Sequence, residues 1–408
     1  MSQREHKLDS SQAAHKFVCV FNRNRDDYEV ALALHEAGLL DRLVTEFYSP
    51  DSLKRLPHLS RRHRNGLSSR MVNVSLASFA IQYGGALLRR SMRKVFAVSD
   101  RLLARHAHKL AQHRRAGLYA YSSYFEGKPE LSPGCPVIDF EYHPHPAFAL
   151  DLLASDVARH PEAAWSFKRE QEVAATESLS NAWEFADAVV CASSVTKRSL
   201  IHAGCPVERI TVVPYGAPEG CPVPTKGPAA APCRFLFVGQ GIQRKGLHHL
   251  SRAWRQAGLA NAKLAVISYL LDPGIAPALD QPGITVLGRQ DRAALNRAFA
   301  EADVFVLPSL IEGFGLVYLE ALNAGCHVIG TTNTGLVDLH LSAKAATLIE
   351  PGDIDALAVA LNYAAQTKAL GQLDPEAIQR EAQVWTRSDF RRGIADHARQ
   401  VTSLCASC

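Results

Sequence analysis

Acidic side chains are almost absent between Ser52 and Ala116, a stretch that holds fifteen Lys or Arg and a single acid, Asp100. The net charge of the whole 408-residue chain is only +5, so positive charge is concentrated there. Such a stretch is expected to face an anionic partner, such as phospholipid, a phosphorylated substrate or nucleic acid. Aromatic side chains for stacking on bases are few in it, which counts against nucleic acid.

A long, purely apolar run is also missing. Met71–Leu88 carries no charge over eighteen residues, but polar side chains and a glycine pair interrupt it, which argues against a membrane span. Because Arg89, Arg90, Arg93 and Lys94 follow, two interpretations stay open. The stretch is either a core helix with charged ends or an amphipathic helix in a membrane interface. The polar start, MSQREHKLDSSQAAHK, predicts no signal peptide.

Paired cysteines are lacking too. The nine cysteines are odd in number and scattered, which suits a reducing compartment better than a disulfide framework. We therefore expect a cytoplasmic protein, with peripheral association at the inner face of the plasma membrane as a hypothesis. Cys405 and Cys408 form an isolated C-x-x-C, which we interpret as a frayed tail and not a metal site. The D-x-D at Asp353 and Asp355 is expected to cap a helix.

What the chain does contain is a repeated strand–helix–strand order. Apolar runs at Phe17–Phe21 and Leu43–Tyr48 flank a helical pattern at Tyr28–Ala37, and this order returns as far as Ile210–Val213. Pro214–Pro232 is rich in Pro and Gly and interrupts the series, which then begins again. Repeated βαβ units predict parallel sheets. Longer helices are expected around Trp165–Phe185 and over Pro375–Gln400.

This order predicts an α/β protein of two doubly wound, Rossmann-like domains that face a central cleft, where ligands of such folds bind. The expected divisions are an N-terminal domain over residues 1–218, a linker over 219–232, a C-terminal domain over 233–380 and a last helix over 381–408 that packs back on the N-terminal domain.

The most informative segment is SLIEGFGLVYLEALNAGCHVIG, residues 309–330. Gly313 and Gly315 let the backbone approach a ligand, and the first amides of the following helix suit a phosphate. Glu320 lies about 7–8 Å further along that helix, roughly one sugar away. A carboxylate there can accept from two ribose hydroxyls. The spacing therefore fits a nucleoside diphosphate.

EGFGLVYLEALNAG, preceded by ADVFVLPS, resembles the E-x7-E region of retaining glycosyltransferase family 4, which has the GT-B fold. VGQGIQRKGL resembles the family's glycine loop, VLGRQD its nucleobase-side turn, and ADAVVCASSVTKRSLIHAGCPVERITVVPYG its approach to the linker. The match is good over residues 183–360 and in outline before them. It implies metal-independent, cofactor-free, retaining transfer of a hexose from a nucleotide-sugar to a glycan, lipid-linked or other acceptor, with the donor on residues 233–380 and the acceptor on 1–218.

The resemblance also implies roles for single residues. Arg244 and Lys245 would hold the diphosphate and stabilise the leaving group. Glu312 would contact the transferred sugar, Glu320 the ribose, and His143 would lie near the donor sugar, so that Glu312, His143, Lys245 and Arg244 form the expected catalytic set. The expected donor-binding residues are Gly239, Arg244, Lys245, Arg289, Glu312, Gly313, Phe314, Gly315, Leu316 and Glu320.

The N-terminal half departs from the family's pattern. The glycine-rich loop often found after the first strand is absent, and NRNRDDYE stands there, where Arg23 and Arg25 could serve an anionic acceptor. In VIDFEYHPHP, His145 is the second choice after His143. Asp139 and Glu141 are further polar candidates.

Two other functions stay open. The first is a GT-B sugar-nucleotide epimerase or phosphorylase that shares the nucleotide or phosphate half, although the cofactor-lysine motif of phosphorylases is not found. The second is a non-catalytic basic scaffold or nucleic-acid-binding protein that uses residues 52–116. We expect no nucleic-acid partner, and treat an anionic membrane surface as a hypothesis for that stretch.

Overall fold

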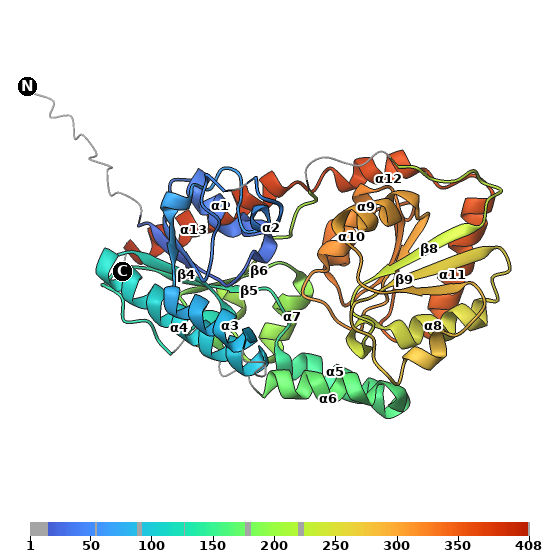
Figure 1. Cartoon of the computed structure of the whole chain (residues 1–408), viewed down its shortest axis with the longest axis horizontal. Coiled ribbons are helices and arrows are strands. Elements are labelled where there is room, and N and C mark those ends of the chain that lie inside the picture. The colour runs from blue at the N-terminus through green and yellow to red at the C-terminus, as the bar shows by residue number, and fades with distance from the viewer. Residues whose placement is uncertain are drawn as a thin grey trace, which may run out of the picture.

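The computed structural model describes residues 15–53, 55–87, 92–125, 127–175, 181–218 and 224–406, which form two domains side by side (Figure 1). Within these residues, the first sheet has seven strands in the order β3-β2-β1-β4-β5-β6-β7 and the second has six in the order β10-β9-β8-β11-β12-β13. Neighbouring strands pair in parallel throughout both sheets. The expected GT-B architecture is confirmed.

The strands of the first sheet are β1 Phe17–Val20, β2 Leu40–Thr45, β3 Val72–Val74, β4 Gly117–Tyr121, β5 Val137–Glu141, β6 Ala188–Cys191 and β7 Ile210–Val212. Those of the second are β8 Cys233–Val238, β9 Ala262–Ile267, β10 Ile284–Leu287, β11 Val304–Val306, β12 His327–Thr331 and β13 Ala346–Ile349. Strands β1, β4 and β6 are buried along their whole length. Helices cover both faces of a parallel sheet, so its central strands are apolar runs without alternation.

The first domain has α1 Glu29–Glu36, α2 Pro57–Ser60, α3 Leu76–Leu87, α4 Met92–Arg114, α5 Pro146–Arg159, α6 Ala164–Ala174 and α7 Ser194–His202. The rest of the chain adds α8 Leu247–Ala257, α9 Arg292–Glu301, α10 Leu316–Asn323, α11 Ile354–Ala369, α12 Pro375–Ala382 and α13 Arg387–Ala406. In Figure 1, α1 and α13 lie on one side of the first sheet and α3 and α4 on the other.

The chain passes between the domains twice, and the two passages touch. The backbone N–H of Ala217 donates to the carbonyl of Trp385 at 2.7 Å. Helix α13 then runs back along the N-terminal domain and packs on α1, where Arg391 lies 2.8 Å from Glu29 and 2.9 Å from Glu36. The last helix therefore belongs to the first domain's core.

Several expected element bounds are wrong. The single helix over Pro375–Gln400 is two helices, α12 and α13, because the chain crosses between domains at residues 383–386. Helix α6 ends at Ala174, well before Phe185, and α5 and β13 were not predicted. Met71–Leu88 contains strand β3 as well as helix α3, so a single helix there is wrong. The helix cap at Asp353 is confirmed, since its side chain accepts from the N–H of Ala356.

Two predictions fall partly outside the described residues. The charged end of the Met71–Leu88 stretch includes Arg89 and Arg90, and the C-x-x-C pair includes Cys408; none of these three residues is described. The cysteines that are described are free thiols. In the described part of the chain, no helix combines the length and the apolar character needed to cross a bilayer.

Phe390 tests the docking of α13. Its side chain is 2% exposed, and its ring centroid lies 4.7 Å from that of Tyr215 and 6.5 Å from that of Phe140. Phe390→Ala should lower the free energy of unfolding by about 3–5 kcal/mol, because it leaves a cavity in this aromatic cluster. Leu404→Ala, on the same helix but 61% exposed, is the control. If both variants lowered the melting temperature equally, the packing of α13 on the N-terminal domain through Phe390 would be contradicted.

Candidate active site

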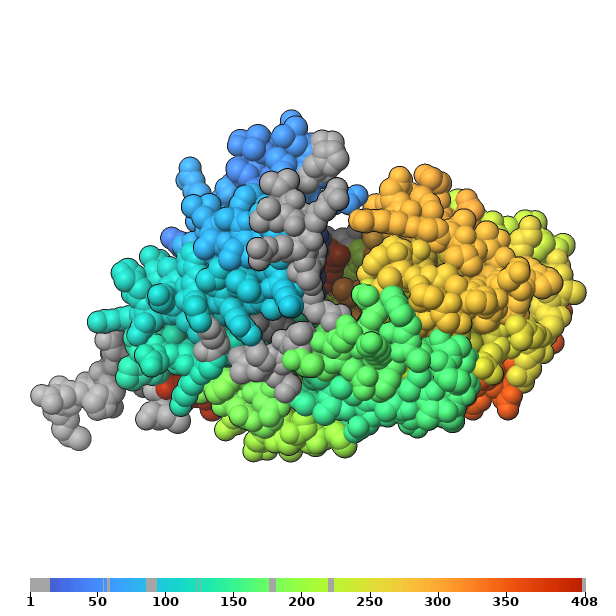
Figure 2. All heavy atoms as spheres, turned by 60° about the horizontal axis from the view of Figure 1, so that its bottom comes forward, coloured from blue at the N-terminus to red at the C-terminus, as the bar shows by residue number. Residues whose placement is uncertain are grey.

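The candidate active site lies in the cleft between the domains, visible in Figure 2 as a hollow between the blue N-terminal and the yellow and orange C-terminal surfaces. Loops after four parallel strands contribute to it: Arg25–Tyr28 after β1, residues 142–143 after β5, Gln243–Lys245 after β8 and residues 307–315 after β11. A pocket of about 310 Å³ there is lined by Arg25, Tyr142, His143, Glu170, Arg244 and apolar side chains. Ligands of doubly wound folds bind at this edge, outside the carboxyl ends of the strands.

Glu312 is the centre of an ion cluster. Its Oε1 lies 2.8 Å from Nη1 of Arg244 and 2.6 Å from Nζ of Lys245. Nε of Arg244 is also 3.5 Å from Oε1 of Glu170, which belongs to α6 of the N-terminal domain. The side chain of Glu312 is only 7% exposed. The cluster thus joins the RKG and EGFG motifs, which lie far apart in the sequence, and reaches across the cleft.

The charges in this cluster depend on one another. Burial opposes ionisation of Glu312, but Lys245 and Arg244 outweigh it and hold the pKa of Glu312 below its usual value. Burial lowers the pKa of Lys245, and Glu312 partly offsets this effect. Burial also opposes the charge of Arg244, but Glu312 and Glu170 raise its pKa. Two partly desolvated cations beside a pocket suit an anionic ligand with several oxygens.

Two glycines permit close backbone approaches around the cluster. Gly246 has φ 68°, and a Cβ there would lie 1.9 Å from the carbonyl oxygen of Pro308. A Cβ on Gly313 would lie 2.1 Å from the carbonyl oxygen of Tyr142. The carbonyl of Gly313 also accepts from the hydroxyl of Ser193. The glycine turn is therefore in direct contact with the N-terminal domain.

His143 lines the same pocket, where solvent reaches it only from within the cleft and protein surrounds it closely. Desolvation, followed by the positive charges of Arg244 and Arg25, lowers the pKa of His143 to about 3. The ring is therefore neutral near pH 7, and can donate one hydrogen bond and accept another. His145 has a structural role instead: its Nδ1 accepts from the N–H of Ala147 at 3.3 Å and caps α5.

Asp139 and Glu141 are not among the side chains that line this pocket. Both are buried, and Asp139 is fully buried in strand β5. Burial, followed by the charge of Glu141, raises the pKa of Asp139 well above its usual value. Asp139 therefore lies inside the N-terminal domain, away from the cleft pocket.

Glu320 lies apart from Glu312, in a second hollow of about 230 Å³. Its Oε1 is 2.7 Å from Nη1 of Arg292, on the first turn of α9. Leu316 lines this hollow too, one residue after Gly315, which has φ 88° and caps α10. Glu320 thus lines the second hollow, whereas Glu312 is connected to the first through its ion pair with Arg244, which lines that pocket.

The remaining expected residues have other surroundings. The N–H of Gly239 donates to the carbonyl of Ile267 at 3.1 Å, so this amide is used within the fold. Phe314 is buried, and its ring centroid lies 5.5 Å from that of Tyr215. Arg289 is exposed after β10. The structure therefore brings together Arg244, Lys245, Glu312, Gly313 and His143, and leaves Gly239, Arg289 and Phe314 outside that group.

Sequence reasoning missed Glu170, Arg292, Tyr142 and Asp26. Glu170 and Arg292 come from helices that approach the motifs only in the folded chain. Tyr142 lies under Arg25, whose guanidinium carbon is 4.2 Å from the ring centroid. Asp26 lines the second hollow, and one sign of it was visible in the sequence, because NRNRDDYE stands where a glycine loop is expected. In the structure, Asp26 adopts φ 47°, which is unusual for a residue other than glycine. Residues with such strained backbone cluster at functional sites.

Titration of His143 tests the electrostatics of the pocket. With a pKa of about 3, its ring should stay neutral from pH 8 down to pH 5. The histidine Cε1 resonances of the folded chain, followed by NMR and assigned with His143→Gln, should show no titration of His143 in that range. A His143 resonance with a midpoint near 6.5, the ordinary value, would contradict the desolvation of the ring and the placement of Arg244 and Arg25 beside it.

The C-terminal part of the chain matches a known family of proteins. Residues 232–367 match the family model of group 1 glycosyl transferases. The amylovoran biosynthesis glycosyltransferase AmsK of Erwinia amylovora is 27% identical over 219 residues, which cover 50% of this chain and 52% of AmsK. The putative colanic acid biosynthesis glycosyltransferase WcaL of Escherichia coli is 26% identical over 49% of this chain and 52% of WcaL. The chain thus spans about half the length of these curated relatives.

Solved structures show the same two-domain fold over nearly the whole chain. The sucrose-phosphate synthase of Thermosynechococcus elongatus superposes with a TM-score of 0.62 at 16% identity, covering 96% of this chain and 100% of that one. WaaG, a glycosyltransferase of lipopolysaccharide biosynthesis, gives 0.57 at 15% identity, over 93% and 98%. Residues 232–367 are thus similar to the group 1 glycosyl transferases, and both domains together have the two-domain GT-B fold of these solved structures.

Proposed function

We propose that this protein is a retaining glycosyltransferase that moves a hexose from a nucleotide-sugar donor to a glycan or lipid-linked acceptor, without a metal ion. The observation that carries the proposal is the pair of cations, Arg244 and Lys245, that converge on Glu312 at the cleft. The two curated relatives are described as acting in amylovoran and, putatively, colanic acid biosynthesis, which supports a glycan-building reaction.

The cation cluster suggests how the donor binds. A diphosphate carries more negative charge than one carboxylate, so it attracts Arg244 and Lys245 away from Glu312. The two cations then stabilise the charge that builds on the departing phosphate oxygen. Glu312, released from them, accepts hydrogen bonds from hydroxyls of the transferred sugar. Neutral His143 is placed to bind a further sugar hydroxyl.

The transfer step then needs no protein nucleophile. The acceptor oxygen forms a bond to the anomeric carbon on the face from which the nucleoside diphosphate departs. The bond between that carbon and the phosphate oxygen breaks, and the acceptor proton passes to a phosphate oxygen. Configuration is retained, and we expect turnover to continue in EDTA. Glu320 accepts from the ribose hydroxyls in the second hollow, where its ion pair with Arg292 orients it.

The acceptor side offers a surface for an anionic membrane, which is the second part of the proposal. Some cations of residues 52–116 serve the fold, since Arg64 pairs with Glu29 and Arg114 pairs with Asp41. Others form one stripe along α4, where successive exposed residues are three or four apart: Lys94, Val98, Arg101, Arg105 and Lys109. On the neighbouring α3, Leu76 is 77% exposed and Tyr83 54% exposed. Cations beside exposed apolar side chains suit an interface with anionic lipid.

Kinetics of cluster variants test the transferase proposal. Lys245→Ala and Glu312→Gln should each lower kcat by about 10²–10³, because each removes a group that acts on charge or hydroxyls in the transition state. The assay is sugar transfer or donor hydrolysis with UDP-, GDP- and ADP-sugars, in EDTA. Near-normal rates in both variants, or loss of activity in EDTA that Mn²⁺ restores, would overturn the proposed site or its metal independence.

Glu320→Gln is the matched control, because it makes the same chemical change as Glu312→Gln in the other hollow. Ribose contacts persist from ground state to transition state, so this variant should raise KM and change kcat little. A hundredfold fall in kcat at unchanged KM would contradict the ribose assignment.

Liposome co-sedimentation tests the membrane proposal. Binding should rise with the fraction of anionic lipid and fall as salt is added, because salt shortens the Debye length. Changing Lys94, Arg101 and Lys109 to Gln should weaken binding, since each cation near the surface contributes about 1 kcal/mol. The control changes the exposed Arg255, Lys263 and Arg297 of the C-terminal domain to Gln. Equal binding by both triple variants, or none by the native chain at low salt, would refute this part.

A further inference from the structure

A cluster of three histidines and an aspartate lies where the two domains meet, on elements that the proposed reaction does not use. Asp156 comes from α5, and His160 follows the end of this helix. His248 and His249 come from the first turn of α8 in the C-terminal domain. Figure 2 shows the green α5–α6 segment extending from the N-terminal domain to the C-terminal surface. The cluster therefore connects α5 of the N-terminal domain to α8 of the C-terminal domain, away from the segments around Ala217 and Trp385 where the chain crosses between the domains.

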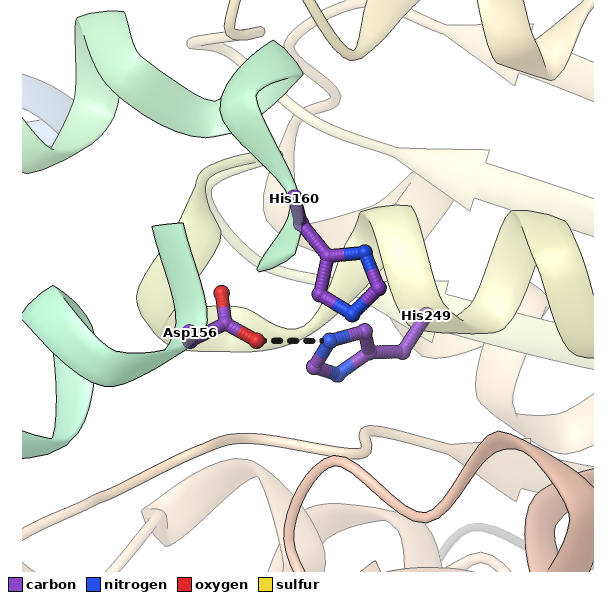
Figure 3. Close-up of side chains that lie close together, drawn as sticks. All are labelled: Asp156, His160 and His249. Carbon is purple, nitrogen blue, oxygen red and sulfur yellow. Dashed lines mark ion pairs between the residues drawn. The ribbon is translucent and has the colours of Figure 1, made fainter. Parts of the chain in front are cut away.

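Three of these side chains direct ligand atoms to one point. One ligand atom from each of Asp156, His160 and His249 lies within 4.8 Å of the other two. Nε2 of His249 is 2.8 Å from Oδ1 of Asp156. Figure 3 shows the ring of His160 beside that of His249, with a nitrogen of each ring turned toward the same region near the carboxylate. Small side-chain shifts would place all three around a single ion.

The converging atoms lack hydrogen bonds. Oδ1 of Asp156, both ring nitrogens of His249 and Nδ1 of His160 are buried and have no hydrogen-bond partner. The side chains of Asp156 and His249 are 1% and 2% exposed. Nε2 of His249 and Oδ1 of Asp156 are therefore paired only with each other, as an ion pair. A buried polar atom without a hydrogen bond costs about 1–3 kcal/mol, so a cation bound between these atoms would remove part of that cost.

The surrounding contacts prepare the carboxylate for such a ligand. Oδ2 of Asp156 accepts from Nε2 of Gln243 at 2.9 Å and lies 3.0 Å from Nε2 of His248. These two donors orient the carboxylate and leave Oδ1 directed at His249. Bound metals commonly have ligands that are held in this way by a second layer of hydrogen bonds. His248 is therefore a positioning residue in this arrangement.

We propose that Asp156, His160 and His249 bind one divalent ion of the zinc class, which connects helix α5 of the N-terminal domain to helix α8 of the C-terminal domain. Two imidazole nitrogens and one carboxylate oxygen suit zinc and its transition-metal neighbours, whereas calcium and magnesium prefer oxygen ligands alone. A water molecule completes tetrahedral coordination. The ion is structural: its ligands are separate from Glu312, Arg244 and Lys245, and it takes no part in sugar transfer.

Metal binding by the full-length, untagged chain tests the proposal. After treatment with a chelator and its removal, Zn²⁺ alone should bind at one ion per chain by calorimetry and raise the melting temperature, because an ion that binds only the folded state stabilises it. Co²⁺ in place of Zn²⁺ should give the visible absorption of tetrahedral coordination. A near-ultraviolet band from thiolate ligands would instead assign the ion to cysteines and overturn the proposal.

Variants locate the ion. His249→Gln and His160→Gln should each weaken Zn²⁺ binding by at least about tenfold. His160→Gln is the gentler change, because it leaves the ion pair between Asp156 and His249 intact, and it keeps the test valid if His249→Gln folds poorly. His113→Gln, on the exposed end of α4, is the matched control and should bind as the native chain does. Absence of Zn²⁺ binding, or unchanged affinity in His160→Gln, would overturn the proposal. Neither result depends on the transferase activity.

Discussion

The pairing of Glu312 with Arg244 and Lys245 is the interaction on which the cleft depends. A carboxylate with 7% of its side chain exposed stays ionised only if opposite charges replace its water shell. Two adjacent residues of one loop provide these charges, so the loops after β8 and β11 cannot move independently. Gly246 lets the two loops touch, because any Cβ there would meet the carbonyl of Pro308. Charge and close backbone contact thus hold the same pair of loops.

The relation between the domains follows from contacts that converge on these loops. Gly313 of the C-terminal domain contacts the backbone of Tyr142 in the N-terminal domain. Glu170 of the N-terminal domain pairs with Arg244 of the C-terminal domain, so the charge of each residue depends on the other domain. Helices α5 and α6 reinforce the junction. The backbone N–H of Ser166 on α6 donates to Asp272 in the C-terminal domain at 3.0 Å, with both residues buried. A ligand that disturbs the Glu312 cluster therefore acts directly on the domain interface.

The loop after β1 has positive φ angles without glycine, and ion pairs hold it in that conformation. Asp26 and Asp27 adopt φ 47° and 56°, which is unfavourable for residues with a Cβ. Asp27 lies 2.8 Å from Arg387 and 3.2 Å from Arg64, so ion pairs from α13 and from the basic stretch hold the loop in place. Some of the positive charge that suggested an anionic partner thus has an internal role. Lys94, Arg101 and Lys109 are exposed on α4 and have no such role in holding this loop.

Local patterns in the sequence determined much of this protein. Apolar runs separated by helical periods predicted most of the strands and their parallel pairing, and the glycine turn with its two glutamates pointed to the loop after β11, because both patterns depend on neighbouring residues. Tertiary structure decided what depends on distant residues. It ended the predicted helix Pro375–Gln400 at the crossing between domains, and it placed Glu320 beside Arg292. It also made His145 a helix cap while His143 faces the cleft, and it brought Asp156 to His249. Such pairings arise from packing between domains, for which no short-range pattern exists.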